Sequence, residues 1–303
     1  MRRMKKLLAL GMATMMVLSM AGCGSTAETA QSSVAESTTP ATTTAAETTQ
    51  AAETAETAQA VDTSNMGPSL KEIYDRGYIL IGLDTTFPPF CFQDPATGDV
   101  YGMMVEFGDN LAKKLGVDVK YQAESFGTLL SDLTTDKVDL VCAAVTVTEE
   151  RKDIMMFSDS YIATADTMVV RTEDLDKYSD LDSFKGTTIA ANNGTSQQTH
   201  AETIEGATVI ACDGSADAIL QLVSGTVDAC VVDSVNGRQY VEANGGKITM
   251  VDTAAFESND KAVAAQLGNE DLVEACNEVI AEMDFDALVD YYTKLSVEIL
   301  GSK

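Results

Sequence analysis

The chain has 303 residues, 45% hydrophobic and 22% charged, a balance typical of globular proteins and long enough for two domains. Its 47 acidic residues outnumber its 20 basic ones, so the formal net charge is −27. Such a chain lacks the basic surface that nucleic-acid binding needs, and it disfavours phosphate ligands. The acidity favours solubility and, to a smaller degree, cationic ligands.

The first residues are typical of a secretory signal peptide. Basic residues within Met1–Lys6 precede an apolar run from Leu7 to Met20. That run is shorter than the ~20 residues that a helix needs to cross a bilayer, which argues against the alternative of a membrane anchor helix. We therefore expect residues 1–22 to be removed on secretion.

Residues 23–66 are expected to form a lipid-anchored stalk. Ala21-Gly22-Cys23 resembles the cleavage site of bacterial lipoproteins, with Cys23 as the lipidated residue. One acyl chain binds membranes only marginally, so a multiply acylated cysteine is the physically reasonable anchor. The segment after Cys23 is rich in Thr, Ala, Glu, Ser and Gln, a composition that buries no core and favours disorder. The lipid would hold the protein at the outer face of the cell membrane.

From residue 78 onward, apolar segments of strand length alternate with segments of helical periodicity. The predicted strands cover residues 78–83, 117–122, 139–145, 187–191, 207–211, 227–232, 248–251 and 262–266. The predicted helices cover residues 105–115, 126–135, 216–223, 270–283 and 286–295, and one more begins at Ser196. This alternation predicts an α/β protein with parallel sheets that are covered by helices on both faces.

The strand predicted at residues 139–145 ends in polar residues that suit a ligand. Thr146, Thr148 and Arg151 follow it in the segment KVDLVCAAVTVTEER. In open α/β sheets, ligands bind outside the carboxyl ends of the strands. An arginine there presents a planar fork of donors that matches a carboxylate. The alternative is that residues 149–152 are only an exposed, charged helix start.

A second segment, TVDACVVDS at residues 226–234, has the same layout and ends in Asp233. Two similar units suggest two related lobes. An acid and an arginine that face each other across a cleft would suit a zwitterion such as a free α-amino acid. The alternative for Asp233 is a cap at the end of the strand or a surface acid.

Several motifs in order make the chain similar to the bacterial extracellular solute-binding proteins of family 3. They are GLDTTFPPFCF, AAVTVTEER, FSDSY, NNGTS and VDACVVD. The resemblance implies a two-lobed, periplasmic-binding-protein-like fold of type II, in which each lobe is a sheet flanked by helices and two hinge segments join the lobes. Residues 67–163 and 263–303 would form lobe 1, and residues 164–262 would form lobe 2. Ligand would bind between the lobes and close the hinge.

The resemblance also assigns the site. Arg151 would hold the ligand carboxylate with help from Thr146 and the Ala144 backbone, and Asp233 would hold the α-ammonium. The remaining expected ligand-binding residues are the aromatic pair Phe87 and Phe126, the polar residues Asp84 and Asn192, and Thr195 and Ser196 at a helix start, which could equally be a plain cap. The chain departs from the family pattern at Met103 and Met104, which replace a bulky residue and an acid.

These observations predict a monomeric, non-catalytic receptor that binds a polar neutral or basic α-amino acid outside the cell. It would deliver the ligand to the permease subunits of an ABC importer. No cofactor or metal is expected, because His200 is the only histidine and the chain has no CxxC motif. The alternatives are a dehydratase of prephenate-like compounds on the same fold and a ligand-sensing adapter to a receptor.

Overall fold

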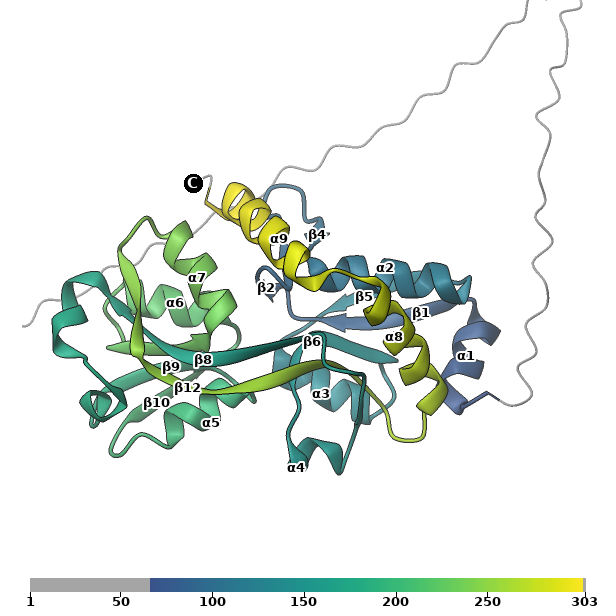
Figure 1. Cartoon of the computed structure of the whole chain (residues 1–303), viewed down its shortest axis with the longest axis horizontal. Coiled ribbons are helices and arrows are strands. Elements are labelled where there is room, and N and C mark those ends of the chain that lie inside the picture. Colours follow the sequence, from purple (N-terminus) through teal and green to yellow (C-terminus); the bar gives the residue numbers. More distant parts are fainter. Residues whose placement is uncertain (1–65, 302–303) are drawn as a thin grey trace, which may run out of the picture. The chain divides into compact units, whose positions relative to one another are not determined.

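The computed structural model describes residues 66–301 (Figure 1). The signal peptide, the lipidation site Cys23 and all but the last residue of the stalk lie outside the described residues. Within residues 66–301, no helix is both long and apolar enough to cross a membrane.

Helices and strands alternate along the described chain. The α-helices are α1 Pro68–Arg76, α2 Met103–Leu115, α3 Phe126–Thr134, α4 Glu149–Lys152, α5 Ser196–Glu202, α6 Ser215–Val223, α7 Ser234–Ala243, α8 Glu270–Glu282 and α9 Phe285–Leu300, with short 3-10 helices η1 Thr172–Lys177 and η2 Leu181–Phe184. The strands are β1 Tyr78–Leu83, β2 Thr86–Phe87, β3 Cys91–Gln93, β4 Val100–Tyr101, β5 Asp118–Ala123, β6 Leu140–Thr146, β7 Met156–Phe157, β8 Ile162–Arg171, β9 Thr188–Asn192, β10 Thr208–Cys212, β11 Ala229–Asp233 and β12 Ile248–Ala265.

The main sheet has the strand order β10-β9-β11-β8-β12-β6-β1-β5. Lobe 1 contains β5, β1 and β6, which are mutually parallel, and lobe 2 contains β10, β9 and β11, also parallel. Between them, β8 and β12 pair antiparallel with each other and with their neighbours (Figure 1). The predicted two-lobed α/β fold is therefore confirmed. The expected parallel pairing is present within each lobe, but the crossing strands β8 and β12 are antiparallel and make the sheet as a whole mixed.

The crossing strand β12 corrects a second prediction. The separate strands predicted at residues 248–251 and 262–266 are one strand from Ile248 to Ala265. The polar residues in its middle have no apolar alternation, yet they pair with β8 through register shifts between Met250 and Ala255 and between Ala255 and Ser258. Pairing with a neighbouring strand holds this segment extended where its own sequence gives no such signal.

Helix α2 accommodates the unusual methionines. Met103 and Met104 are both fully buried, in the same core cluster as Phe107 and Leu111 of the same helix. The flexible thioether side chains fill the space that the expected bulky residue would take. Before them, Gly102 has φ +134°, and a Cβ there would lie 2.3 Å from the carbonyl oxygen of Phe90. This glycine is therefore needed for the close approach of the loop to the helix.

Candidate ligand-binding site

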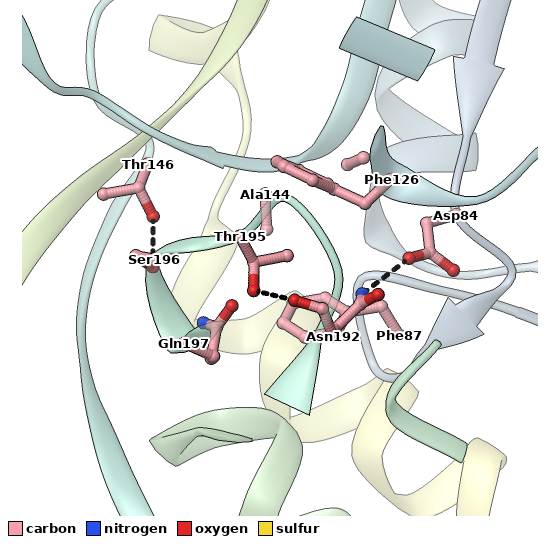
Figure 2. Close-up of a pocket in the computed structure, with 10 residues that line it drawn as sticks. Asp84, Phe87, Phe126, Ala144, Thr146, Asn192, Thr195, Ser196 and Gln197 are labelled. Atoms are coloured by element: carbon pink, nitrogen blue, oxygen red, sulfur yellow. Dashed lines mark hydrogen bonds between the residues drawn. The ribbon is translucent and has the colours of Figure 1, made fainter. Parts of the chain in front are cut away.

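A pocket lies at the carboxyl ends of the strands, where lobe 1 faces lobe 2 (Figure 2). Lobe 1 contributes residues that follow β1 or lie on β2, α3 and β6, and lobe 2 contributes residues from the end of β9 and the start of α5. The lining residues are Asp84, Phe87, Phe126, Ala143, Ala144, Thr146, Asn192, Thr195, Ser196 and Gln197. Eight of the ten predicted ligand-binding residues are therefore brought together here, while Arg151 and Asp233 lie beside this lining.

The pocket is nearly filled by the side chains around it. Its remaining cavity is only ≈ 10 Å³, about enough for one water molecule. Direct hydrogen bonds cross it from one lobe to the other: Asn192 Nδ2 donates to Asp84 Oδ2 at 3.2 Å, and the Thr146 and Ser196 hydroxyls lie 3.2 Å apart. A ligand of amino-acid size would need the two lobes to separate before it could enter.

Arg151 connects the two lobes at the edge of the pocket. Its Nη1 donates to the Thr146 carbonyl at 2.8 Å in lobe 1, and its Nη2 donates to the Gly194 carbonyl at 3.1 Å in lobe 2. Its guanidinium lies 5.3 Å from the centre of the Phe126 ring. Burial lowers the pKa of Arg151, and the charges of Glu150 and Asp166 oppose that shift. A guanidinium has five N–H donors, so three remain for a ligand.

Thr148 explains how Arg151 is placed. Its side chain caps α4 by accepting a hydrogen bond from the Arg151 backbone N–H at 3.2 Å. The segment is therefore a helix start, as the alternative interpretation of residues 149–152 held. The exposed charges of that turn belong to Glu149, Glu150 and Lys152, whereas Arg151 is half-buried and folds back toward the pocket. The same turn is therefore a charged helix start and also directs the Arg151 side chain toward the pocket.

The opposite end of the pocket is made of hydrogen-bond acceptors. Asp84 is 2% exposed and accepts bonds from the Thr86 backbone N–H at 2.9 Å and hydroxyl at 2.7 Å, besides the Asn192 amide. Burial raises the pKa of Asp84, and these three donors oppose the shift. Within the described part of the chain, the buried Asn192 Oδ1 has no hydrogen-bond partner. Buried acceptors without a partner are uncommon, so this oxygen is available to a donor from a ligand or from water.

The start of α5 brings two hydroxyls to the pocket. The Thr195 side chain caps the helix by accepting from the Gln198 backbone N–H at 3.4 Å, and it donates to the Asn192 carbonyl at 2.5 Å. The predicted cap is therefore confirmed at Thr195. Ser196 follows it and reaches across to Thr146.

The apolar walls come from lobe 1. Phe87 and Phe126 are 8% and 5% exposed, and both line the pocket. The Phe87 ring stacks on Phe90 with centroids 5.3 Å apart, and Phe90 is fully buried in the core, as expected. Between the walls, Ala144 has φ +49°, a left-handed conformation that is uncommon for a residue with a Cβ. Such local backbone strain tends to occur at functional sites.

Asp233 is fully buried at the end of β11. Its Oδ1 accepts from the Val235 backbone N–H at 2.9 Å and caps α7, so the cap interpretation is confirmed. Its Oδ2 accepts a short hydrogen bond from the Thr164 hydroxyl. The ammonium of Lys261 lies 3.5 Å from the same oxygen and donates to Thr146 Oγ1 at 2.8 Å. Lys261 thus connects Asp233 to Thr146, which lines the pocket.

Sequence reasoning missed three residues of this region: Ala143, Gln197 and Lys261. Ala143 and Gln197 are neighbours of predicted residues and line the pocket. Gln197 also donates to Asp166 Oδ1 at 2.6 Å. A signal for Lys261 was present, since it is a lone lysine at the start of the apolar run AVAA.

Comparison with known proteins gives the class. The family model for bacterial extracellular solute-binding proteins, family 3, matches residues 79–294. L-cystine-binding protein TcyJ of Escherichia coli K12 is 31% identical over 218 residues, which cover 72% of this chain and 81% of that protein. L-cystine-binding protein TcyA of Bacillus subtilis is 26% identical over 233 residues, covering 77% of this chain and 86% of that protein. Arginine-bound ArgBP from T. maritima, a Gly52Ala mutant, superposes with a TM-score of 0.67 at 32% identity, covering 71% of this chain and 100% of that one.

The chain therefore belongs to the bacterial extracellular solute-binding proteins of family 3. Its pocket between two lobes lies where binding of a solute can couple to hinge closure.

Proposed function

We propose that this protein is an extracytoplasmic receptor that binds a polar neutral or basic α-amino acid between its lobes and delivers it to an ABC importer. Relatives named for binding cystine, arginine, lysine, ornithine, glutamine and histidine support the amino-acid class. The observation that carries the proposal is the polarity of the pocket, with donors at one end and acceptors at the other.

The donor end suits a carboxylate. The Arg151 guanidinium adjoins the hydroxyls of Thr146 and Ser196 across the boundary between the lobes. A buried carboxylate needs a charged partner and additional hydrogen bonds to offset its desolvation. Lobe 1 supplies the arginine and the Thr146 hydroxyl, and lobe 2 supplies the Ser196 hydroxyl, so a carboxylate that accepts from these groups would hold both lobes.

The acceptor end suits a ligand side chain that donates. Asp84 and the unpartnered Asn192 Oδ1 would accept from an amide, a guanidinium or an ammonium. An acidic side chain would meet the buried Asp84 carboxylate and be repelled. The rings of Phe87 and Phe126 add apolar contact and, for a cation, attraction to a ring face.

A thermal-shift screen of the purified protein against the twenty amino acids tests the proposal. A ligand bound only by the folded state raises the melting temperature. We expect the largest rises from amino acids with amide or cationic side chains, and no rise from aspartate or glutamate. Arg151→Ala should remove the response, whereas the control Arg238→Ala, at an exposed position of α7, should keep it. A response confined to the acidic amino acids would overturn the assignment of Asp84 and Asn192.

The N-terminal segment, outside the described residues, completes the proposal. Cleavage after residue 22 and lipidation of Cys23 would tether the receptor to the outer face of the cell membrane through the stalk at residues 23–66. Cys23→Ala should release the mature protein into the medium. Retention of the variant in the membrane fraction would contradict the lipid anchor.

We infer a receptor without catalytic activity. Asp84 is the one carboxylate among the residues that line the pocket, and Thr86 and Asn192 already engage it. A dehydratase would need an acid poised over a leaving group. One structural neighbour, at 28% identity, is the ancestral amino-acid-binding protein AncCDT-1, a precursor of cyclohexadienyl dehydratase. Incubation with prephenate should therefore give no aromatic product absorbance, and its appearance would make the enzyme the better description.

A further inference from the structure

Lys261 is a buried cation at the centre of the hinge. It is 1% exposed on the crossing strand β12, paired with Thr146 of β6 on one side and with Ile162 of β8 on the other. Lysine is almost never fully buried unless it is paired. The groups that contact its ammonium therefore indicate the role of Lys261.

The contacts of Lys261 are those of a bound ammonium group. Its Nζ donates to Thr146 Oγ1 at 2.8 Å and lies 3.5 Å from Asp233 Oδ2. The neighbouring carboxylate of Asp166 has partners of its own, Gln197 Nε2 at 2.6 Å and His200 Nδ1 at 2.9 Å. Asp233 accepts from the Thr164 hydroxyl and the Val235 backbone N–H, and Lys261 is the cation in ion-pair contact with it, although the charge of Lys261 also lowers the pKa of Asp166. Burial raises the pKa of Asp233, and the charge of Lys261 opposes the shift most strongly.

We propose that Lys261 supplies from within the chain the cation that Asp233 would otherwise take from an α-amino group of the ligand. The carboxylate, the threonine hydroxyl and the buried setting together form an ammonium subsite, and the lysine fills it. A second ammonium placed against Asp233 would meet the like charge of Lys261 at close range, which disfavours it.

The consequence is a broader ligand class than α-amino acids. Lys261 donates to Thr146 Oγ1, so the Thr146 hydroxyl hydrogen is left to donate, either to Ser196 or to a ligand carboxylate. The ligand would be a carboxylate with a hydrogen-bond donor at its far end, and an α-amino group would add little. This inference rests on the proposed function for the donor end and the acceptor end of the pocket, and it concerns only how the α-amino group of a ligand is treated.

Titration calorimetry on matched pairs tests it. Each amino acid is measured beside the carboxylate that lacks only its α-amino group: L-arginine beside δ-guanidinovalerate, L-lysine beside ε-aminocaproate, and L-glutamine beside glutaramate. We expect the two members of a bound pair to have dissociation constants within about tenfold of each other. If Asp233 bound the ligand ammonium, the member without it would be weaker by more than about a hundredfold.

Lys261→Met keeps an unbranched side chain that is shorter only by the ammonium nitrogen, and it removes the charge. We expect this variant to shift the preference toward the amino acid by at least about tenfold, because Asp233 then needs the ligand ammonium as its partner. Adding Asp233→Asn to Lys261→Met should remove this preference again, and Asp233→Asn alone should create none. If Lys261→Met does not fold, the matched ligand pairs measured on the wild-type protein still test the proposal.

The outcomes separate the two proposals. Binding of the amino acids with more than hundredfold weaker binding of their partners would overturn the role of Lys261 and leave the proposed receptor intact. Binding of only the carboxylates that lack the α-amino group would support the role proposed for Lys261 and would remove α-amino acids as ligands. Binding of none of the six compounds would overturn both.

Discussion

Replacing Arg151 with alanine should weaken ligand binding more than any other single change at the donor end. The substitution removes the two bonds that the guanidinium makes to the Thr146 carbonyl in lobe 1 and the Gly194 carbonyl in lobe 2. It also removes the cation proposed for the ligand carboxylate. These losses act on the state in which the lobes meet, since only there does one side chain reach both.

The magnitude follows from the unpaired carboxylate. Removing one partner of a buried ion pair costs about 3–5 kcal/mol. The two freed carbonyls become accessible to water when the lobes separate, so their bonds add little net free energy. Arg151 is half-buried, which favours the lower end of that range. A loss of about 3 kcal/mol corresponds to a rise in Kd of roughly 150-fold.

Calorimetric titration with the amino acid that gives the largest thermal shift measures this change directly. Arg151→Lys should fall between wild type and Arg151→Ala, because an ammonium keeps the charge but not the planar fork that reaches two carbonyls and a carboxylate. Arg238→Ala controls for the loss of one positive charge in a strongly acidic protein. An unchanged Kd for Arg151→Ala, with the fold intact by circular dichroism, would remove this residue from the site.

Three further changes have defined outcomes. Gly102→Ala should lower the free energy of unfolding in urea by about 3 kcal/mol, whereas Gly98→Ala, with φ +82° and nothing within 4 Å, should cost about 1 kcal/mol; equal costs would contradict the close-approach argument. Thr146→Val should destabilise the protein by about 1–3 kcal/mol, because Lys261 loses its hydrogen-bond acceptor, and unchanged stability would show that the ammonium finds another. Burial raises the pKa of Asp84, so affinity for a cationic ligand should fall as the pH drops through that raised pKa and Asp84 takes up a proton. Asp84→Asn should abolish this pH dependence in fluorescence titrations. A pH dependence that survives the substitution belongs to another group.

The central strands of the two lobes, β1, β6, β9 and β11, were predictable because most of their residues are buried. β1 matches its predicted range of residues 78–83, and β6 is offset from its prediction by one residue. All seven residues of β6 are buried, so they form the continuous apolar run that a parallel strand needs. The polar residues that follow such runs become the pocket residues by the geometry of the sheet alone.

The elements between the lobes were not predictable in the same way. Helix α7 buries Asn236 and Gln239 beside Tyr240, so its inner face lacks the apolar period of a core helix. That face meets lobe 1, where Asn236 Nδ2 donates to the Pro88 carbonyl at 2.7 Å and Tyr240 Oη donates to the Thr86 carbonyl at 2.9 Å. Polar contacts between lobes leave no mark in a hydrophobic pattern.

The same reason hid Lys261 and the continuity of β12. A lysine in a strand is ordinarily an exposed residue, and nothing in its neighbours in sequence places it against Asp233. That contact arises because β11, β8, β12 and β6 lie in this order in the sheet, which brings Asp233, Lys261 and Thr146 together from distant parts of the chain. Long-range strand order of this kind is a property of the assembled fold.

The small cavity determines how affinity arises in this protein. The polar groups that would bind a ligand already engage one another across the lobes: Asp84 with Asn192, Thr146 with Ser196, and Arg151 with the Gly194 carbonyl. A ligand must exchange these bonds for its own, and such an exchange is worth only about 0.5–1.5 kcal/mol per hydrogen bond. The net gain therefore comes from groups that the chain leaves incompletely satisfied, the Asn192 Oδ1 and the free donors of Arg151. Among the polar contacts, selectivity should follow those two groups together with the charge of Asp84, because the remaining hydrogen bonds are replaced rather than added.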